Sequence, residues 1–185
     1  MSDRSEVSTA DSPNAAELLL EQLQLEWMQL LEQSVNRIDH CVSQLDADQI
    51  WWRPAADQNS IGAVLRHLAG NLKQWVVEGV PDIRGTRDRS AEFDGPPSET
   101  AEQLMAVLCQ VVADAKQVLQ SLTAAELQQN RSIQSFDVTV LGAIMHSVPH
   151  FVGHTHQIVQ LTRLQLGESY RFHWTPEEER RHVPL

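Results

Sequence analysis

The spacing of apolar residues is the feature that most constrains the fold of this chain, because it follows helical periodicity through four long segments. Apolar residues recur every three or four positions over residues 13–45, 60–78, 98–122 and 138–166, which places them along one side of a helix. No segment alternates apolar and polar residues convincingly enough to predict a strand, and residues 129–137 are predicted to form a loop. Four such helices joined by loops predict an all-α protein, a four-helix bundle.

Residues that favour helix ends set the limits of the predicted bundle. The pair Ser12-Pro13 is typical of a helix start, with serine as the cap and proline in the first turn. Ser60 is a typical cap for the second helix, and Gly167 favours the end of the fourth. We therefore predict one domain, the four-helix bundle, over residues 13–167.

The remaining segments are predicted to be irregular. Residues 1–12 are small, charged and without period, which predicts a disordered N-terminal tail. Residues 168–185 are predicted to form a mostly irregular C-terminal extension. Residues 46–59 connect the first two helices, and the polar segment 79–97 is predicted to be a long loop that either borders a functional site or is mobile.

Charge and hydropathy exclude two kinds of partner. The formal net charge is −11 and no run of Lys or Arg occurs, so the phosphate backbone of a nucleic acid would be repelled. No stretch reaches the roughly 18 consecutive apolar residues of a membrane-spanning helix, and the N-terminus lacks the apolar core of a signal peptide. Cys41 and Cys109 are predicted to be small buried residues without a disulfide framework. We predict a cytoplasmic protein that binds neither nucleic acid nor membrane.

Four of the eight histidines lie between residues 146 and 156, and two of them have the spacing of metal ligands. His150 and His154 are four residues apart in the fourth helix, so their imidazoles lie on one face, one turn apart. A zinc-like ion needs at least three protein ligands. His67 is the best candidate for the third, because it lies on a polar flank of the second helix that is able to line a cavity. The alternative for His67 is a half-buried histidine bonded to a backbone carbonyl.

The other histidines are predicted to lie beside this site or away from it. His146 precedes His150 by one turn, and we predict that it supports the ligands from outside or acts as a weak general base. The alternatives for His146 are a solvent-facing position and a role as a fourth ligand. His156 points about 200° away from His154 around the helix, which places it off the site. Surface positions are predicted for His40, His173 and His182.

Two neighbours of His150 add to the description of the fourth helix. Pro149 removes one helical hydrogen bond, which predicts a kink beside the candidate ligand. Phe151 stands where a zinc protease of the H-E-x-x-H kind carries its general-base glutamate. Peptidase activity of that class is therefore disfavoured.

The fourth helix also has two apolar faces. Leu141, Met145 and Val148 lie on one side of it, and Leu161 and Leu164 lie with the histidines on the other. One face is expected to meet the interior of the bundle. The other is predicted to meet a second copy of the chain, so we predict a homodimer.

Several short motifs surround the candidate ligands. They are Trp52-Arg53-Pro54, Asn59-Ser60-Ile61-Gly62, Leu65-Arg66-His67-Leu68 and the segment from His150 to Ile158. With these motifs the chain resembles, over about residues 15–166, the DinB-like (YfiT-type) superfamily of metal-dependent bacterial four-helix proteins. The resemblance implies that His67, His150 and His154 hold a divalent metal ion, Zn²⁺, Ni²⁺ or a similar one, between the second and fourth helices.

The resemblance also implies an enzyme. Relatives in that superfamily include a mycothiol-dependent maleylpyruvate isomerase and a bacillithiol transferase, so it implies a thiol-dependent S-transferase or isomerase. The field of the cation would deprotonate a small-molecule thiol, which would attack an electrophilic substrate. With water in place of the thiol, the same site predicts a metal-dependent hydrolase. A further alternative is a dimeric, stress-associated helical protein that binds metal without catalysis.

Overall fold

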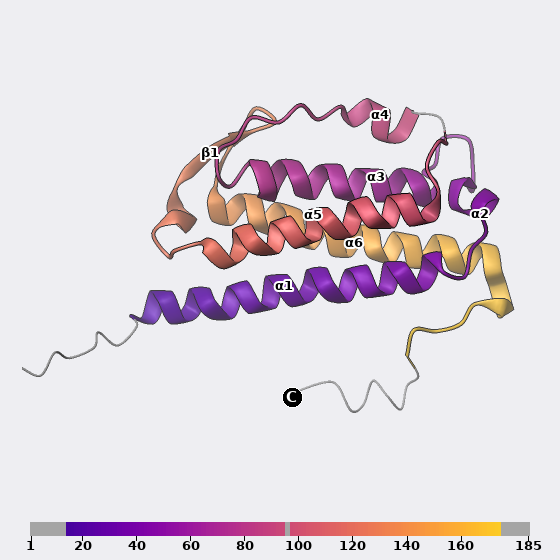
Figure 1. Ribbon diagram of the computed structural model, residues 1–185, viewed down its shortest axis with the longest axis horizontal. Coiled ribbons are helices and arrows are strands. Elements are labelled where there is room, and N and C mark those ends of the chain that lie inside the picture. The colour runs from indigo at the N-terminus through magenta and orange to yellow at the C-terminus, as the bar shows by residue number, and fades with distance from the viewer. Residues whose placement is uncertain (1–13, 95–96, 175–185) are drawn as a thin grey trace, which may run out of the picture.

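The computed structural model describes residues 14–94 and 97–174, in which four long helices pack side by side as a bundle (Figure 1). They are α1 (Ala15–Val42), α3 (Ile61–Leu72), α5 (Ala101–Ser121) and α6 (Val140–Leu166). The last turns of the second predicted helix form a π-helical segment, η1 (Lys73–Glu78), directly after α3. The four-helix bundle predicted from the apolar spacing is confirmed.

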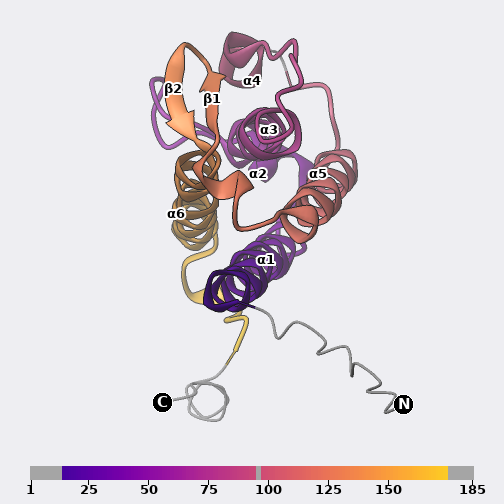
Figure 2. The same cartoon turned by 90° about the vertical axis from the view of Figure 1, so that its left-hand side faces the viewer.

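The helices do not alternate in direction along the chain. α1 and α6 run one way, α3 and α5 run the other way, and a long return connection that contains α4 (Arg89–Asp94) joins α3 to α5 (Figure 1). One hydrogen bond reflects the parallel course of α1 and α6, since Gln165 near the end of α6 donates to the carbonyl of Gln49, shortly after α1. In the view along the bundle, α4 lies outside α3 (Figure 2). Such a long crossover is one of the recognised ways of connecting a four-helix bundle.

Side-chain caps define the ends of the long helices. Asn14 caps α1, where its Oδ1 accepts hydrogen bonds from two backbone N–H groups of the first turn. The predicted pair Ser12-Pro13 lies outside the described residues. Ser60 accepts a hydrogen bond from the N–H of Ala63 at the start of α3, and Gly167 ends α6 with a φ of 52°, as predicted for both ends.

Short helices and a pair of strands lie in segments that were predicted to be irregular. α2 (Ala47–Trp51) occupies part of the first connection, and α4 occupies part of the second. The predicted loop 129–137 is wrong, because β1 (Asn130–Ile133) and β2 (Phe136–Thr139) pair as an antiparallel hairpin. Its turn residues, Gln134 and Ser135, have φ values of 52° and 67°. That conformation is usual for a two-residue hairpin turn, but it is normally signalled by Gly, Asn or Asp, so the sequence carried no turn signal.

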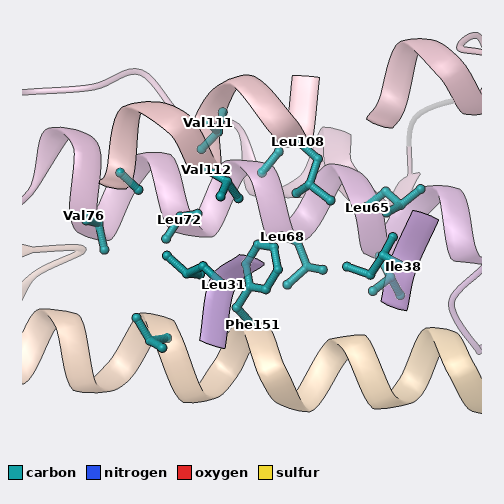
Figure 3. Packing of buried hydrophobic residues seen from close by; sticks show 14 of the residues in the cluster. Leu31, Ile38, Leu65, Leu68, Leu72, Val76, Leu108, Val111, Val112 and Phe151 are labelled. Atoms are coloured by element: carbon teal, nitrogen blue, oxygen red, sulfur yellow. The ribbon is translucent and has the colours of Figure 1, made fainter. Parts of the chain in front are cut away.

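The core lies between the four helices, with Phe151 of α6 close to its centre (Figure 3). Phe151 is 1% exposed and is among the largest fully buried side chains. The side chains packed in this cluster include Leu31, Ile38, Leu65, Leu68, Leu72, Val76, Leu108, Val111 and Val112. Because Phe151 follows His150 directly, the same turn of α6 supplies both the centre of the core and a candidate ligand.

Both apolar faces of α6 are partly covered within the chain. α6 packs against α1 and against α3. On one face Val148 is buried and Met145 is 51% exposed, and on the other Leu161 is buried and Leu164 is 61% exposed. A second subunit is therefore not required to explain the two faces, and the homodimer stays a prediction.

The predictions about the two cysteines, a membrane-spanning helix and the chain ends have different outcomes. Cys41 and Cys109 are both free thiols, but Cys109 is exposed, so its predicted burial is wrong. Within residues 14–94 and 97–174, no helix is both long enough and apolar enough to cross a membrane. The predicted tail, residues 1–12, lies outside the described residues, as does most of the C-terminal extension, and the domain limits stay predictions.

Candidate metal centre

Three histidines from two helices come together in the bundle. His67 of α3 meets His150 and His154 of α6, and one nitrogen from each lies within 4.8 Å of the other two. His67 is 5% exposed, and the other two are half-buried. α3 and α6 pack against each other, and this packing brings His67 to two residues more than 80 positions away in the sequence.

The spacing of these nitrogens suits a single bound ion. Nε2 of His67 lies 3.1 Å from Nε2 of His150. Two nitrogens that bind one zinc ion at about 2.1 Å are separated by about 3.0 to 3.4 Å when their bond angle is between about 90° and 109°. The ring centroids of His150 and His154 are 4.4 Å apart, and that of His67 lies 5.1 Å from that of His154. The three imidazoles therefore fit a shared divalent cation.

His67 is oriented by residues of α4. Nδ1 of His67 lies 2.9 Å from Oε2 of Glu92, and the imidazole packs against the ring of Phe93 with 4.9 Å between centroids. A carboxylate only accepts hydrogen bonds, so Nδ1 carries a proton, and Nε2 is the nitrogen that faces His150. The alternative bond from His67 to a backbone carbonyl is thus wrong.

Glu92 is in turn paired with a buried arginine. Arg87 donates from Nε to Oε1 of Glu92 at 2.6 Å and from Nη2 to Oε2 at 2.7 Å, and both side chains are less than a tenth exposed. Nη1 of Arg87 donates to Oε1 of Gln74, which lies on η1. Burial acts to raise the pKa of Glu92, but the hydrogen bonds from Arg87 and His67 and the charge of Arg87 lower it below its ordinary value. Glu92 is therefore an ionised carboxylate.

The two histidines of α6 differ in their support. Nδ1 of His154 lies 2.7 Å from Oε1 of Gln157, an amide oxygen that accepts a hydrogen bond from Nδ1–H. Nδ1 of His150 is buried and has no hydrogen-bond partner among the described residues. Two of the three candidate ligands thus have an outer hydrogen bond that turns Nε2 toward the site.

The surroundings keep the α6 pair neutral, which is the form that binds metal. Burial, followed by the nearby His154 and His67, lowers the pKa of His150 to about 4. Burial also lowers the pKa of His154, although its hydrogen bond to Gln157 acts in the opposite direction. Near pH 7 both imidazoles therefore have a free nitrogen lone pair.

His146 lies beside the three-histidine group and not in it. Its ring packs on that of Trp75, with 4.0 Å between centroids, and stacks 5.8 Å from that of His150. The side chain is exposed, while partial desolvation and then the charge of Arg87 lower the pKa of His146. A supporting or proton-accepting role for His146 stays a prediction.

The remaining histidines lie elsewhere. His156 is exposed and its Nε2 lies 3.3 Å from Nη1 of Arg37, so it is off the site as predicted. His40 is tied to the C-terminal segment, because its Nε2 lies 2.7 Å from the carbonyl oxygen of Arg171 and its ring lies 5.1 Å from that of His173. His182 lies outside the described residues.

Sequence reasoning missed the residues that support His67. Arg87 and Glu92 fall in the segment 79–97, which was predicted to be a loop without assigned contacts. A usable signal was Asp88, which accepts a hydrogen bond from the N–H of Ala91 and thus caps the short helix that carries Glu92. The contact with His67 itself has no sequence signal, since it depends on the return of the chain over α3.

Fold and site together define a class of protein, a four-helix bundle with a candidate metal centre of three histidines on two facing helices. Residues 20–178 match the family model described as protein of unknown function DUF1572, and the chain therefore belongs to this family. No curated protein matches the chain.

Solved structures that include DinB-like proteins share this fold. YfiT from Bacillus subtilis, described as a probable metal-dependent hydrolase with an unusual four-helix bundle topology, is 16% identical, with a TM-score of 0.66 over 86% of this chain and 94% of that chain. A DinB-like protein from Bacillus cereus is 16% identical, with a TM-score of 0.62 over 78% and 91%. A second DinB-like protein from Bacillus subtilis is 14% identical, with a TM-score of 0.60 over 82% and 99%. At these identities the likeness concerns the fold.

Proposed function

We propose that this protein is a metal-dependent enzyme in which His67, His150 and His154 hold one divalent cation. The observation that carries the proposal is the convergence of the three imidazoles, with Nε2 of His67 and Nε2 of His150 only 3.1 Å apart. Three imidazole nitrogens are a donor set suited to Zn²⁺ or Ni²⁺. Three protein ligands leave further positions for an exogenous group.

A divalent cation held there supplies Lewis acidity, which lowers the pKa of a water or thiol that binds beside the histidines. The chain's own residues orient the ligands, through Glu92 at His67 and Gln157 at His154. His146 has an exposed imidazole and a lowered pKa. It is therefore neutral near pH 7 and able to accept a proton from a group bound next to His150.

Hydrolysis is the first of two reactions that this site supports. The fold neighbour YfiT is described as a probable metal-dependent hydrolase, and water is always available at a half-exposed site. Transfer of a small-molecule thiol to an electrophile, or thiol-dependent isomerisation, is the second, and it rests on the resemblance to thiol-dependent DinB-like enzymes. The two are distinguished by whether turnover requires an added thiol.

Metal analysis of protein purified without a histidine tag tests the ligand set. We expect about one equivalent of Zn²⁺ or Ni²⁺ per chain after loading, and none in His154→Ala. His156→Ala is the matched control, because His156 lies on the same helix but contacts Arg37 away from the site. Full metal content in His154→Ala, or equal loss in both variants, would contradict the proposed ligands.

Activity measurements then separate the two reactions. The loaded protein is assayed with activated esters alone, and with an electrophile plus a low-molecular-weight thiol. Hydrolysis predicts turnover without thiol, whereas transfer predicts turnover that saturates with thiol. In either case activity is expected to be lost in His154→Ala and retained in His156→Ala.

A further inference from the structure

We infer that Glu92 and Arg87 are positioning residues of the candidate metal centre, which hold His67 with its proton on Nδ1 and its Nε2 free for the ion. This inference rests on the proposed function for its metal-binding consequence. α4 supplies no candidate ligand, but through Glu92 it orients the ligand His67.

The contacts leave the carboxylate of Glu92 little freedom. Each of its oxygens accepts from Arg87, at 2.6 and 2.7 Å, and Oε2 also accepts from Nδ1 of His67 at 2.9 Å. The third nitrogen of Arg87, Nη1, donates a hydrogen bond to Oε1 of Gln74 on η1. Paired hydrogen bonds of this kind fix geometry as well as adding energy. The carboxylate is thus locked in the orientation that faces His67.

This arrangement selects one tautomer of the imidazole. Nη2 of Arg87 also lies 3.1 Å from Nδ1 of His67, and its second N–H is able to donate there only when Nδ1 is unprotonated. Nδ1 would then present a lone pair to Oε2 of Glu92 at 2.9 Å, which places two acceptors together with no proton between them. The carboxylate of Glu92 is therefore the group that accepts the hydrogen bond from Nδ1–H of His67. A carboxylate behind a metal-binding histidine is a common device, which fixes ring orientation and increases the basicity of the ligand.

Gly70 provides the space for the ion pair. It lies one turn after His67 on α3, and a Cβ at this position would overlap Oε1 of Glu92 and lie 2.9 Å from Nε of Arg87. Glu92 and Arg87 therefore pack directly against a bare stretch of the α3 backbone. Alanine at position 70 would displace them without removing either charge.

Two variants and one control test the inference. Glu92→Gln keeps the shape of the side chain but removes its charge and one acceptor oxygen. Gly70→Ala keeps both charges and favours the helix intrinsically, so it serves if Glu92→Gln does not fold. Glu99→Gln is the matched control, because Glu99 pairs with Arg66, the neighbour of His67 on α3, and makes no contact with His67 in the hydrogen bonds described.

The first measurement is the Kd for Zn²⁺, obtained by competition with a chelating dye. We expect Glu92→Gln and Gly70→Ala each to bind Zn²⁺ about 10- to 100-fold more weakly than the wild type. Glu99→Gln is expected to bind as the wild type does. Wild-type affinity in both test variants would overturn the inference.

The second measurement is the tautomer of His67 in the metal-free protein, from the ¹⁵N chemical shifts of its ring nitrogens. We expect protonated Nδ1 in the wild type and in Glu99→Gln, and a mixture of tautomers in Gly70→Ala. A wild-type His67 protonated on Nε2 would overturn the inference. If the wild type binds no metal, the proposed function fails, and the tautomer alone decides whether Glu92 and Arg87 position His67.

Discussion

Removal of the Arg87 side-chain charge is the most informative stability test of the structure. Arg87→Met preserves the apolar part of the side chain but leaves the carboxylate of Glu92 buried, with His67 as its remaining donor among the bonds described. The two side chains are 7% and 9% exposed, so both charges lie largely shielded from solvent. The perturbation therefore isolates the cost of an uncompensated buried charge.

The expected magnitude follows from that burial. Breaking a buried ion pair by removing one partner costs about 3 to 5 kcal/mol. In a chain of this size each kcal/mol lowers Tm by about 2 to 4 °C, so Tm should fall by about 6 to 20 °C. Lys116→Met is the control, because Lys116 pairs with Glu32 at side-chain exposures of 32% and 63%. Loss of such an exposed pair costs about 0.2 to 1 kcal/mol.

The assay is unfolding in urea, monitored by circular dichroism, which gives the free energy of unfolding. EDTA is present throughout, because it removes any contribution from bound metal. Addition of Glu92→Gln to Arg87→Met should recover part of the lost stability, because the uncompensated charge is then removed. If Arg87→Met loses no more stability than Lys116→Met, the buried pair is not formed as described. If the double variant is less stable than Arg87→Met, the cost does not come from the charge.

Further predictions concern the core, two glycines of the α6 segment, and pH. Phe151→Ala should lower the free energy of unfolding by about 3 to 5 kcal/mol, because it empties the centre of the core; urea unfolding measures this. Gly167→Ala should cost about 1 to 3 kcal/mol, because its φ of 52° and ψ of −123° suit glycine alone. Gly153→Ala, a helical position with nothing within 4 Å of its Cβ, should instead stabilise by up to about 1 kcal/mol. The folded-state pKa of His150 is lowered from 6.5 to about 4, so the unfolded chain binds more protons within this interval. The metal-free protein should therefore lose stability as pH falls from about 6.5 toward about 4, and His150→Gln should reduce that loss in urea unfolding at pH 5 and pH 7.

The sequence was sufficient for the features that depend on local geometry. The helical period of the apolar residues determines where α1, α3, α5 and α6 lie. The four-residue interval between His150 and His154 places both imidazoles on one face of α6, because each helical residue turns the chain by about 100°. The same geometry places His156 off the site, as its contact with Arg37 confirms.

The predictions that depended on weak local signals in the sequence were wrong. The hairpin β1–β2 turns through Gln134 and Ser135, which seldom adopt positive φ, so residue identity pointed to a loop. Cys109 lies on an amphipathic helix, α5, but on its exposed side. For a single residue near the boundary between faces, the packing of neighbouring helices decides burial.

The sequence by itself determined four helices and one pair of candidate ligands, since both follow from the repeat of a single helix. The tertiary structure decided the rest of the centre. It brings His67 of α3 to within 3.1 Å of His150, and it returns the chain over α3 so that Glu92 faces His67 beside Gly70. These contacts join residues from separate helices, and their distances depend on how the bundle packs, which no local sequence pattern specifies.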